Sequence, residues 1–135
     1  MKKHLIYIYL LASSCHTNDK TEVSKQECEK FKRGKFIQTW DKDSNQYKIE
    51  RNDSNQLEFI GAEGDYIHLK VKWTGPCSYE LAYLSQHITG TDSVLHPSEI
   101  RKLQVDILQI RNDSCFIVGD NGIDQVKGII YIDKK

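Results

Sequence analysis

The chain has 135 residues, and its 19 lysines and arginines equal its 19 aspartates and glutamates, so its formal net charge is zero. This length suits a single domain. Because there is no basic excess to neutralise phosphate groups, the composition argues against a protein that binds nucleic acid.

The first residues have the three regions of an export signal. Lys2 and Lys3 precede an apolar run that ends at Leu11, and three small residues follow. The apolar run is roughly half of the 20 or so residues that a transmembrane helix needs, so we expect no permanent membrane span. We therefore expect residues 1–14 to be removed as a signal peptide.

Residues 10–15, LLASSC, resemble the lipobox of bacterial lipoproteins. In that family the signal peptide is cut off before the cysteine, and the cysteine is acylated. The resemblance implies that Cys15 is the lipidated N-terminus of an exported protein anchored to the cell envelope, at the outer membrane. Two or three acyl chains exceed the single chain that gives only marginal anchoring. Leu11 stands four residues before the cysteine instead of the favoured three, and a plain export signal with Cys15 as a bystander is the alternative.

Residues 15–27 are polar and lack hydrophobic periodicity, which predicts a flexible tether behind the lipidated N-terminus. Residues 28–135 have the pattern of short strands and turns, so we expect one β domain there. Alternation of apolar and polar side chains is clearest in residues 66–73. Eight segments have a strand-like pattern: 35–40, 46–51, 56–61, 66–73, 78–84, 102–110, 115–119 and 125–132.

Short turns link most of these segments, which favours successive antiparallel hairpins. No helix-length pattern separates them, so a parallel α/β fold is excluded. We expect an all-β fold: an antiparallel up-and-down meander of about eight strands, forming a small lipocalin-like barrel or a curved half-barrel. The expected core consists of Ile67, Leu69, Val71, Trp73, Leu81, Val105 and Phe116.

Many of the residues expected to point inward are aromatic, including Phe59 and Phe116. Such side chains would fill most of a small barrel, so we expect a solid core and no open cavity. The pattern of segment 102–110 changes phase between Ile107 and Leu108, which predicts a β-bulge. The connection 85–101 is too long for a hairpin turn, and loops of this length are often functional or mobile.

Three cysteines remain after the expected lipidation of Cys15. In the oxidising compartment of an exported protein, one pair can form a disulfide. Cys28 precedes the first strand and Cys77 follows a turn, so these two are the better candidates, and three free thiols are the alternative. Cys115 lies in a strand-like run and is expected to be buried.

The sequence contains no recognisable catalytic pattern. It lacks a Gly-x-Ser-x-Gly turn, a phosphate-binding glycine loop and a histidine or cysteine pair at zinc-ligand spacing. We therefore expect no enzyme, no metal site and no cofactor. Lys35, Arg51 and Arg111, near strand ends, are interpreted as solvated surface charges.

Several segments resemble a group of small Bacteroidota lipoproteins: residues 28–36, 49–51 with 56–58, 71–73 with 77–81, and 126–128. The likeness spans nearly the whole mature chain, but its motifs are structural and imply no chemistry. Some members are automatically named DNA topoisomerase IV, which this chain does not support, because it has no phosphate loop, no basic groove and no room for an ATPase domain. Asp92-Ser93-Val94 resembles the O-glycosylation motif of exported Bacteroidota proteins, which implies a glycan on Ser93.

Two functions are consistent with a tethered β scaffold. The first is a non-enzymatic binding or structural module of the cell envelope, whose sheet or long loop contacts a protein, glycan or lipid. The alternative is a carrier whose barrel takes one small apolar ligand between aromatic side chains. Candidate ligand-facing residues are Trp40, Tyr47, Trp73 and Tyr83. A carrier needs a cavity of about 300 Å³ or more, which the expected solid core argues against, so the first function is favoured.

Overall fold

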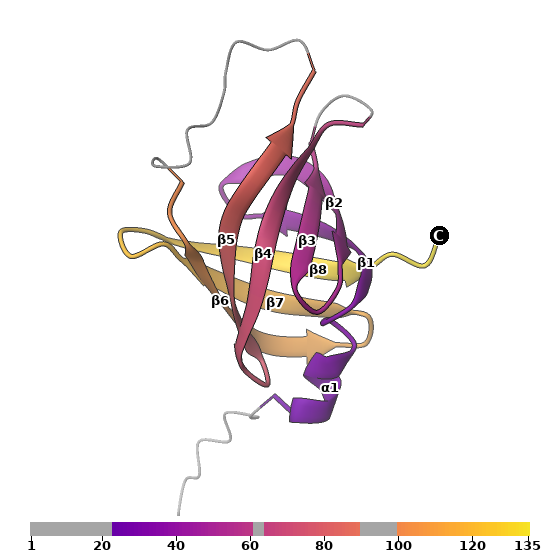
Figure 1. Ribbon diagram of the computed structural model, residues 1–135. Coiled ribbons are helices and arrows are strands. Elements are labelled where there is room, and N and C mark those ends of the chain that lie inside the picture. The colour runs from indigo at the N-terminus through magenta and orange to yellow at the C-terminus, as the bar shows by residue number, and fades with distance from the viewer. Residues whose placement is uncertain (1–22, 61–63, 90–99) are drawn as a thin grey trace, which may run out of the picture.

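The computed structural model describes residues 23–60, 64–89 and 100–135. The expected signal peptide (1–14), Cys15 and most of the tether lie outside these residues, and so does Ser93. The described residues form one short helix and eight strands (Figure 1). These elements are α1 (Lys25–Glu29), β1 (Gly34–Trp40), β2 (Asp43–Arg51), β3 (Asn55–Phe59), β4 (Tyr66–Gly75), β5 (Ser78–His87), β6 (Leu103–Arg111), β7 (Ser114–Asp120) and β8 (Gln125–Ile132).

The eight strands form a closed barrel, in which each strand pairs with its neighbours in the sequence and β1 pairs with β8. Every pairing is antiparallel. The predicted up-and-down meander is therefore confirmed, and the sheet closes completely instead of stopping at a half-barrel. At the closure, Phe36 to Trp40 of β1 pair with Ile132 to Gly128 of β8.

The connections between strands alternate between the two ends of the barrel. At one end, which we call the closed end, α1 lies near the turns β2–β3, β4–β5 and β6–β7 (Figure 1). The Lys30 ammonium donates a hydrogen bond to the Asn112 carbonyl in the turn β6–β7. β1 begins and β8 ends at this rim, where Asp133 N–H donates to the Lys35 carbonyl at 2.9 Å. The opposite end, which we call the open end, carries the other four connections.

Residues 25–27, which we expected in the tether, belong to α1. A helix this short gains its stability from packing. Cys28 on α1 and Phe31 in the following turn are completely buried, and Val23 packs against the core. The folded part of the chain therefore includes residues before Cys28.

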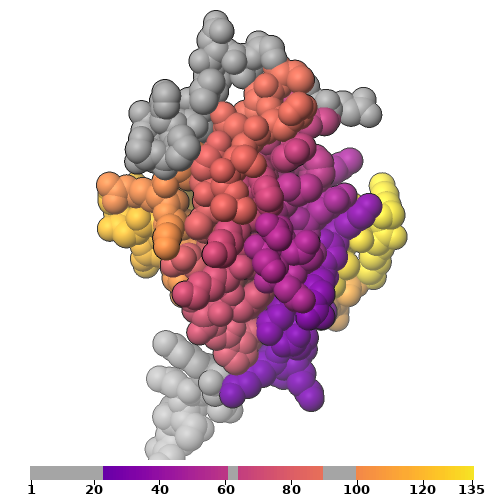
Figure 2. Space-filling view, viewed as in Figure 1, coloured from indigo at the N-terminus to yellow at the C-terminus, as the bar shows by residue number. Residues whose placement is uncertain are grey.

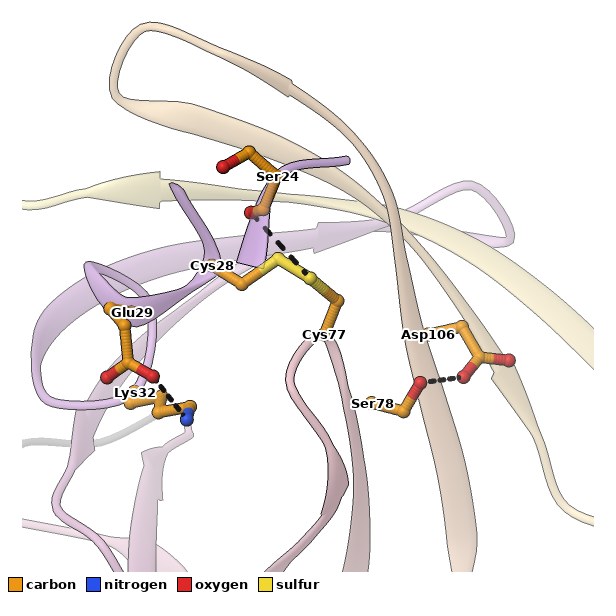
Figure 3. The surroundings of a disulfide bond; sticks show 7 residues. All are labelled: Ser24, Cys28, Glu29, Lys32, Cys77, Ser78 and Asp106. Atoms are coloured by element: carbon orange, nitrogen blue, oxygen red, sulfur yellow. Dashed lines mark hydrogen bonds and ion pairs between the residues drawn. A yellow bond between two sulfur atoms is a disulfide. The ribbon is translucent and has the colours of Figure 1, made fainter. Parts of the chain in front are cut away.

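A disulfide joins α1 to the turn β4–β5 at the closed end (Figure 3). It links Cys28 and Cys77, the pair that the sequence favoured, whose Cα atoms are 5.4 Å apart. Ile107 N–H donates to the Cys77 carbonyl at 2.9 Å, which holds this turn against β6. Cys115 is a free cysteine and is completely buried. The disulfide thus fixes the helix across the closed end.

Packed apolar side chains fill much of the barrel interior. Phe116 faces outward and keeps 36% of its surface exposed, so its expected place in the core was wrong. Its neighbours Cys115 and Ile117 point inward instead, as strand alternation requires. Among the other expected core residues, Val71, Leu81 and Val105 are buried, and Ile67, Leu69 and Trp73 are half-buried.

β6 contains the predicted bulge. Its register with β7 shifts between Ile107 and Gln109. Because of the extra residue, Leu108 turns outward with 56% of its surface exposed, and Ile110 packs against the core. The β-bulge predicted from the change of phase in the sequence is therefore confirmed.

β3 presents polar side chains to the interior. Gln56 is completely buried, and Glu58 lies on the same face of the strand. Leu57 and Phe59 point the other way, although Phe59 was expected to point inward. Phe59 packs edge-on against Tyr66, with ring centroids 6.2 Å apart. Phe59 therefore does not fill the interior, which was one basis for expecting a solid core.

Candidate functional site

A cavity of about 420 Å³, the open-end cavity, lies at the open end of the barrel. Its wall is mainly apolar. Of its four charged residues, Lys42 and Arg101 are exposed, and Asp43 and Glu58 are half-buried. This volume lies within the usual range of ligand pockets. The expectation of a solid core was therefore wrong at this end. The apolar lining consists of Trp40, Ile67, Leu69, Leu81, Tyr83, Ile100, Leu103 and Val126.

The short pairing between β5 and β6 explains why the barrel is hollow here. Within the described residues, this pairing runs only from Ser78 opposite Asp106 to Leu81 opposite Leu103. β5 nevertheless continues to His87 and keeps its pairing with β4, and the two strands form a continuous surface in the space-filling view (Figure 2). The part of β5 beyond Leu81 therefore borders the cavity on the side where β6 is absent.

Gly128 of β8 makes room for the indole of Trp40. The two residues face each other across the β1–β8 pairing. A Cβ at position 128 would lie 2.6 Å from the Thr39 carbonyl oxygen and 2.8 Å from Cε3 of the Trp40 ring. Glycine therefore permits a close approach of ring and backbone that no other residue would allow.

A second hollow at the open end shares Trp40, Glu58 and Ile67 with the open-end cavity and includes Tyr47. The Tyr47 hydroxyl donates a hydrogen bond to the Asp43 carboxylate. This bond raises the pKa of Tyr47 and lowers the pKa of Asp43. The Asp43 carboxylate thus orients the Tyr47 side chain at the open end of β2.

A chain of hydrogen bonds runs through the interior from Arg51 to Glu58. Arg51 is only 5% exposed, and its Nε donates to Gln56 Oε1 at 2.6 Å. Gln56 Nε2 in turn donates to Glu58 Oε1 at 2.7 Å. The other guanidinium nitrogens donate to the Phe31 carbonyl at 2.9 Å and to the Tyr79 hydroxyl at 3.0 Å. The interpretation of Arg51 as a solvated surface charge was therefore wrong.

Glu58 brings this chain to the wall of the cavity. Burial raises the pKa of its carboxyl, and this effect exceeds the opposing effects of the Gln56 hydrogen bond and the Arg51 charge. Part of its surface remains exposed, so the carboxyl is accessible at the cavity. The site thus combines an apolar wall with one inner carboxyl group.

The predicted ligand-facing residues separate into two groups. Trp40 and Tyr83 line the open-end cavity, and Tyr47 lines the second hollow. Trp73 lies near the closed end of β4, where its ring packs against Tyr79 with centroids 4.8 Å apart. Trp73 therefore lines neither hollow, because β4 carries it away from the open end.

Sequence reasoning missed Gln56 and Glu58. The alternation in β3 shows two faces, and we assigned the apolar face to the core. A useful signal was present on the neighbouring strand: Arg51 is in phase with the buried Ile49, and it pairs directly with Gln56. A buried arginine requires polar neighbours, which favours the polar face of β3 for the interior.

Among the described residues, no three His, Cys, Asp or Glu side chains are arranged to hold a metal ion. In the same part of the chain, no helix is long and apolar enough to cross a bilayer. Comparison with known proteins finds no match, whether to a protein family, to a curated protein or to a solved structure.

Proposed function

We propose that the protein is a non-enzymatic binding module of the cell envelope, which holds one small, mainly apolar ligand at the open end of its barrel. The open-end cavity is the observation that carries this proposal, because its volume of about 420 Å³ and its apolar wall suit such a ligand. A meander barrel that is covered at one end and binds a ligand at the other would function in the manner of a lipocalin.

The N-terminal sequence supports the cellular location in this proposal. The lipobox-like LLASSC implies a lipid on Cys15. The likeness to small Bacteroidota lipoproteins agrees with attachment to the outer membrane. In this proposal the membrane is a partner only through the lipid, and the barrel holds its ligand outside the bilayer.

A second candidate is docking of an envelope protein or glycan on the outer face of the barrel. It is favoured by a row of aromatic rings on β3, β4 and β5. The ring centroids are 6.2 Å apart for Phe59 and Tyr66 and 5.6 Å apart for Tyr66 and His87. Aromatic rings are common at protein interfaces. This row contains three rings, and we regard the open-end cavity as the stronger observation.

Native mass spectrometry tests the proposed function on the exported chain, made soluble by Cys15→Ser. We expect one small molecule per chain, either co-purified or taken up from a panel of apolar probes. Ile67→Trp should abolish this binding, because the larger side chain occupies the cavity that Ile67 lines. Leu108→Trp is the matched control, since Leu108 lies on a strand but faces solvent.

A wild-type chain that binds none of the probes would contradict the ligand proposal. If envelope proteins or glycans were then crosslinked to the outer face, the second candidate would be favoured. Equal loss of binding in Ile67→Trp and Leu108→Trp would also count against the cavity as the binding site.

A further inference from the structure

We infer that Glu58 selects the ligand: the molecule at the open end is uncharged, and it donates a hydrogen bond from a hydroxyl or N–H group to the Glu58 carboxyl. This inference rests on the proposed function and names the class of ligand. It concerns one side chain that the expected functions did not use.

The hydrogen bonds of Glu58 leave one oxygen available. Oε1 accepts from Gln56 Nε2 at 2.7 Å, and no hydrogen bond from another described residue reaches Oε2. The carboxyl lies in the wall of both the open-end cavity and the second hollow. When a ligand fills the cavity and displaces water from Oε2, an oxygen left without a partner is costly, so a ligand that supplies a donor is favoured over one that does not.

Arg51 argues against a charged ligand. Its three guanidinium nitrogens are all engaged, and its carbon lies 4.4 Å from the centroid of the Tyr79 ring. Three of its five N–H groups thus bond to protein atoms, and Arg51 does not line the open-end cavity, so it offers no donor to a ligand carboxylate there. Its positive charge is nevertheless close to Glu58, where it would repel a ligand ammonium group in a poorly screened interior.

The remaining cations near the cavity are unsuited to an inner anion site. Lys42 and Arg101 are exposed, and they share the rim with Asp43. A carboxylate held there would leave its apolar chain pointing toward Glu58, without a donor for that carboxyl. The charges around the cavity thus favour a neutral ligand that places its donor at the inner end.

The cavity volume limits the size of the ligand. At about 30 Å³ per small group, about 420 Å³ accommodates roughly 14 non-hydrogen atoms. Decan-1-ol fits this limit and has one hydroxyl donor. Its methyl ether has nearly the same apolar body but cannot donate, and decylamine and decanoic acid supply the charged comparisons.

The fluorescence of Trp40 offers a direct measurement of binding. The chain has two tryptophans, and Trp73 lies near the closed end, so Trp73→Phe leaves Trp40 as the reporter. In this background, at a pH at which Glu58 is ionised and can only accept, we expect decan-1-ol to bind about tenfold more tightly than the ether. Glu58→Met should remove this preference while the ether still binds. Glu58→Gln, which keeps the size of the side chain, provides a second variant if Glu58→Met fails to fold, and it should weaken the preference.

Equal affinities of the alcohol and the ether in the unmodified cavity would overturn the inference and leave the proposed function intact. Tighter binding of decylamine or decanoic acid than of the alcohol would overturn the neutral class. A preference for the alcohol that persists in both Glu58 variants would overturn the role of Glu58. Failure of every probe, together with failure of the wider apolar panel, would instead overturn the proposed function.

Discussion

At Glu58, the loss of hydration makes the stability of the fold depend on pH. Burial raises the pKa of this carboxyl above its usual 4.5, so the folded state holds a proton that the unfolded chain releases. The associated stability is fully present below pH 4.5, and it decreases as pH rises from there through the raised pKa. We expect Glu58→Gln to remove this decrease.

Urea unfolding from pH 4 to pH 8 measures the effect. The free energy of unfolding of Glu58→Gln should increase relative to the wild type as pH rises. Exposed carboxyls with lowered pKa values, such as Asp113 and Asp120, are present in both proteins, so their contributions cancel. A difference that stays constant with pH would show that Glu58 titrates normally.

A substitution at Gly128 would disturb the open end without changing any charge. Gly128→Ala places a methyl group against Thr39 and the Trp40 ring, so we expect a loss of about 1–3 kcal/mol and an altered Trp40 emission maximum. Gly75→Ala is the matched control, because its nearest contact would be a side-chain carbon 3.9 Å away. Unchanged stability and emission in Gly128→Ala would mean that the ring has room to move.

At the scale of the strands, alternation predicted where the elements lie but not always which face is buried. In β4 and β6 the apolar face is the inner one, and the change of phase in β6 is visible in the sequence. In β3 the inner face is polar, because it faces Arg51 across the β2–β3 pairing. Periodicity alone contains no information on this pairing, so Glu58 was not found.

The open-end cavity was unpredictable for a related reason. It depends on how far β5 and β6 pair, and this pairing ends at Leu81 although strand-like sequence continues. It also depends on Gly128, whose small size looked unremarkable in the sequence but places Trp40 at the wall. Strand number and meander topology, by contrast, follow from local patterns and short turns.

The disulfide between α1 and the turn β4–β5 has a predictable contribution to stability. Its two cysteines are 49 residues apart, and closure of a loop of this size lowers the free energy of the folded state relative to the unfolded chain by about 4 kcal/mol. Reduction, or the double change Cys28→Ser and Cys77→Ser, should lower the urea midpoint accordingly. Reduction that leaves the midpoint unchanged would contradict this contribution.

Cys115 provides a control within the same experiment. Burial raises the pKa of its thiol to about 12, so an alkylating reagent should modify it only when the barrel unfolds. In the reduced, folded Cys15→Ser protein we therefore expect labelling at Cys77, which is only half-buried, and not at Cys28 or Cys115, which are completely buried. Labelling of Cys115 at the same rate would indicate that reduction had opened the barrel.

For the whole molecule, the prediction with the largest consequence is the proposed lipid on Cys15. We expect Cys15→Ser to move the protein from the detergent phase of a membrane extract to the soluble exported fraction, because the proposed acyl chains would supply the anchoring free energy. Leu84→Ser, which removes an exposed apolar side chain on β5, is a control that should leave partitioning unchanged. Unchanged partitioning of Cys15→Ser would exclude lipid attachment at this cysteine.

The position of α1 determines how an anchored molecule would be oriented. Residues 16–22 span at most about 25 Å when fully extended, and the chain then joins the barrel at the closed end. The proposed lipid would therefore keep the closed end next to the bilayer and the opening turned toward the aqueous phase. A hydrophobic molecule would have to arrive from solution or from a donor that approaches the opening from the aqueous side. The ligand would then be captured and released on that side, and would not enter laterally from the anchoring leaflet.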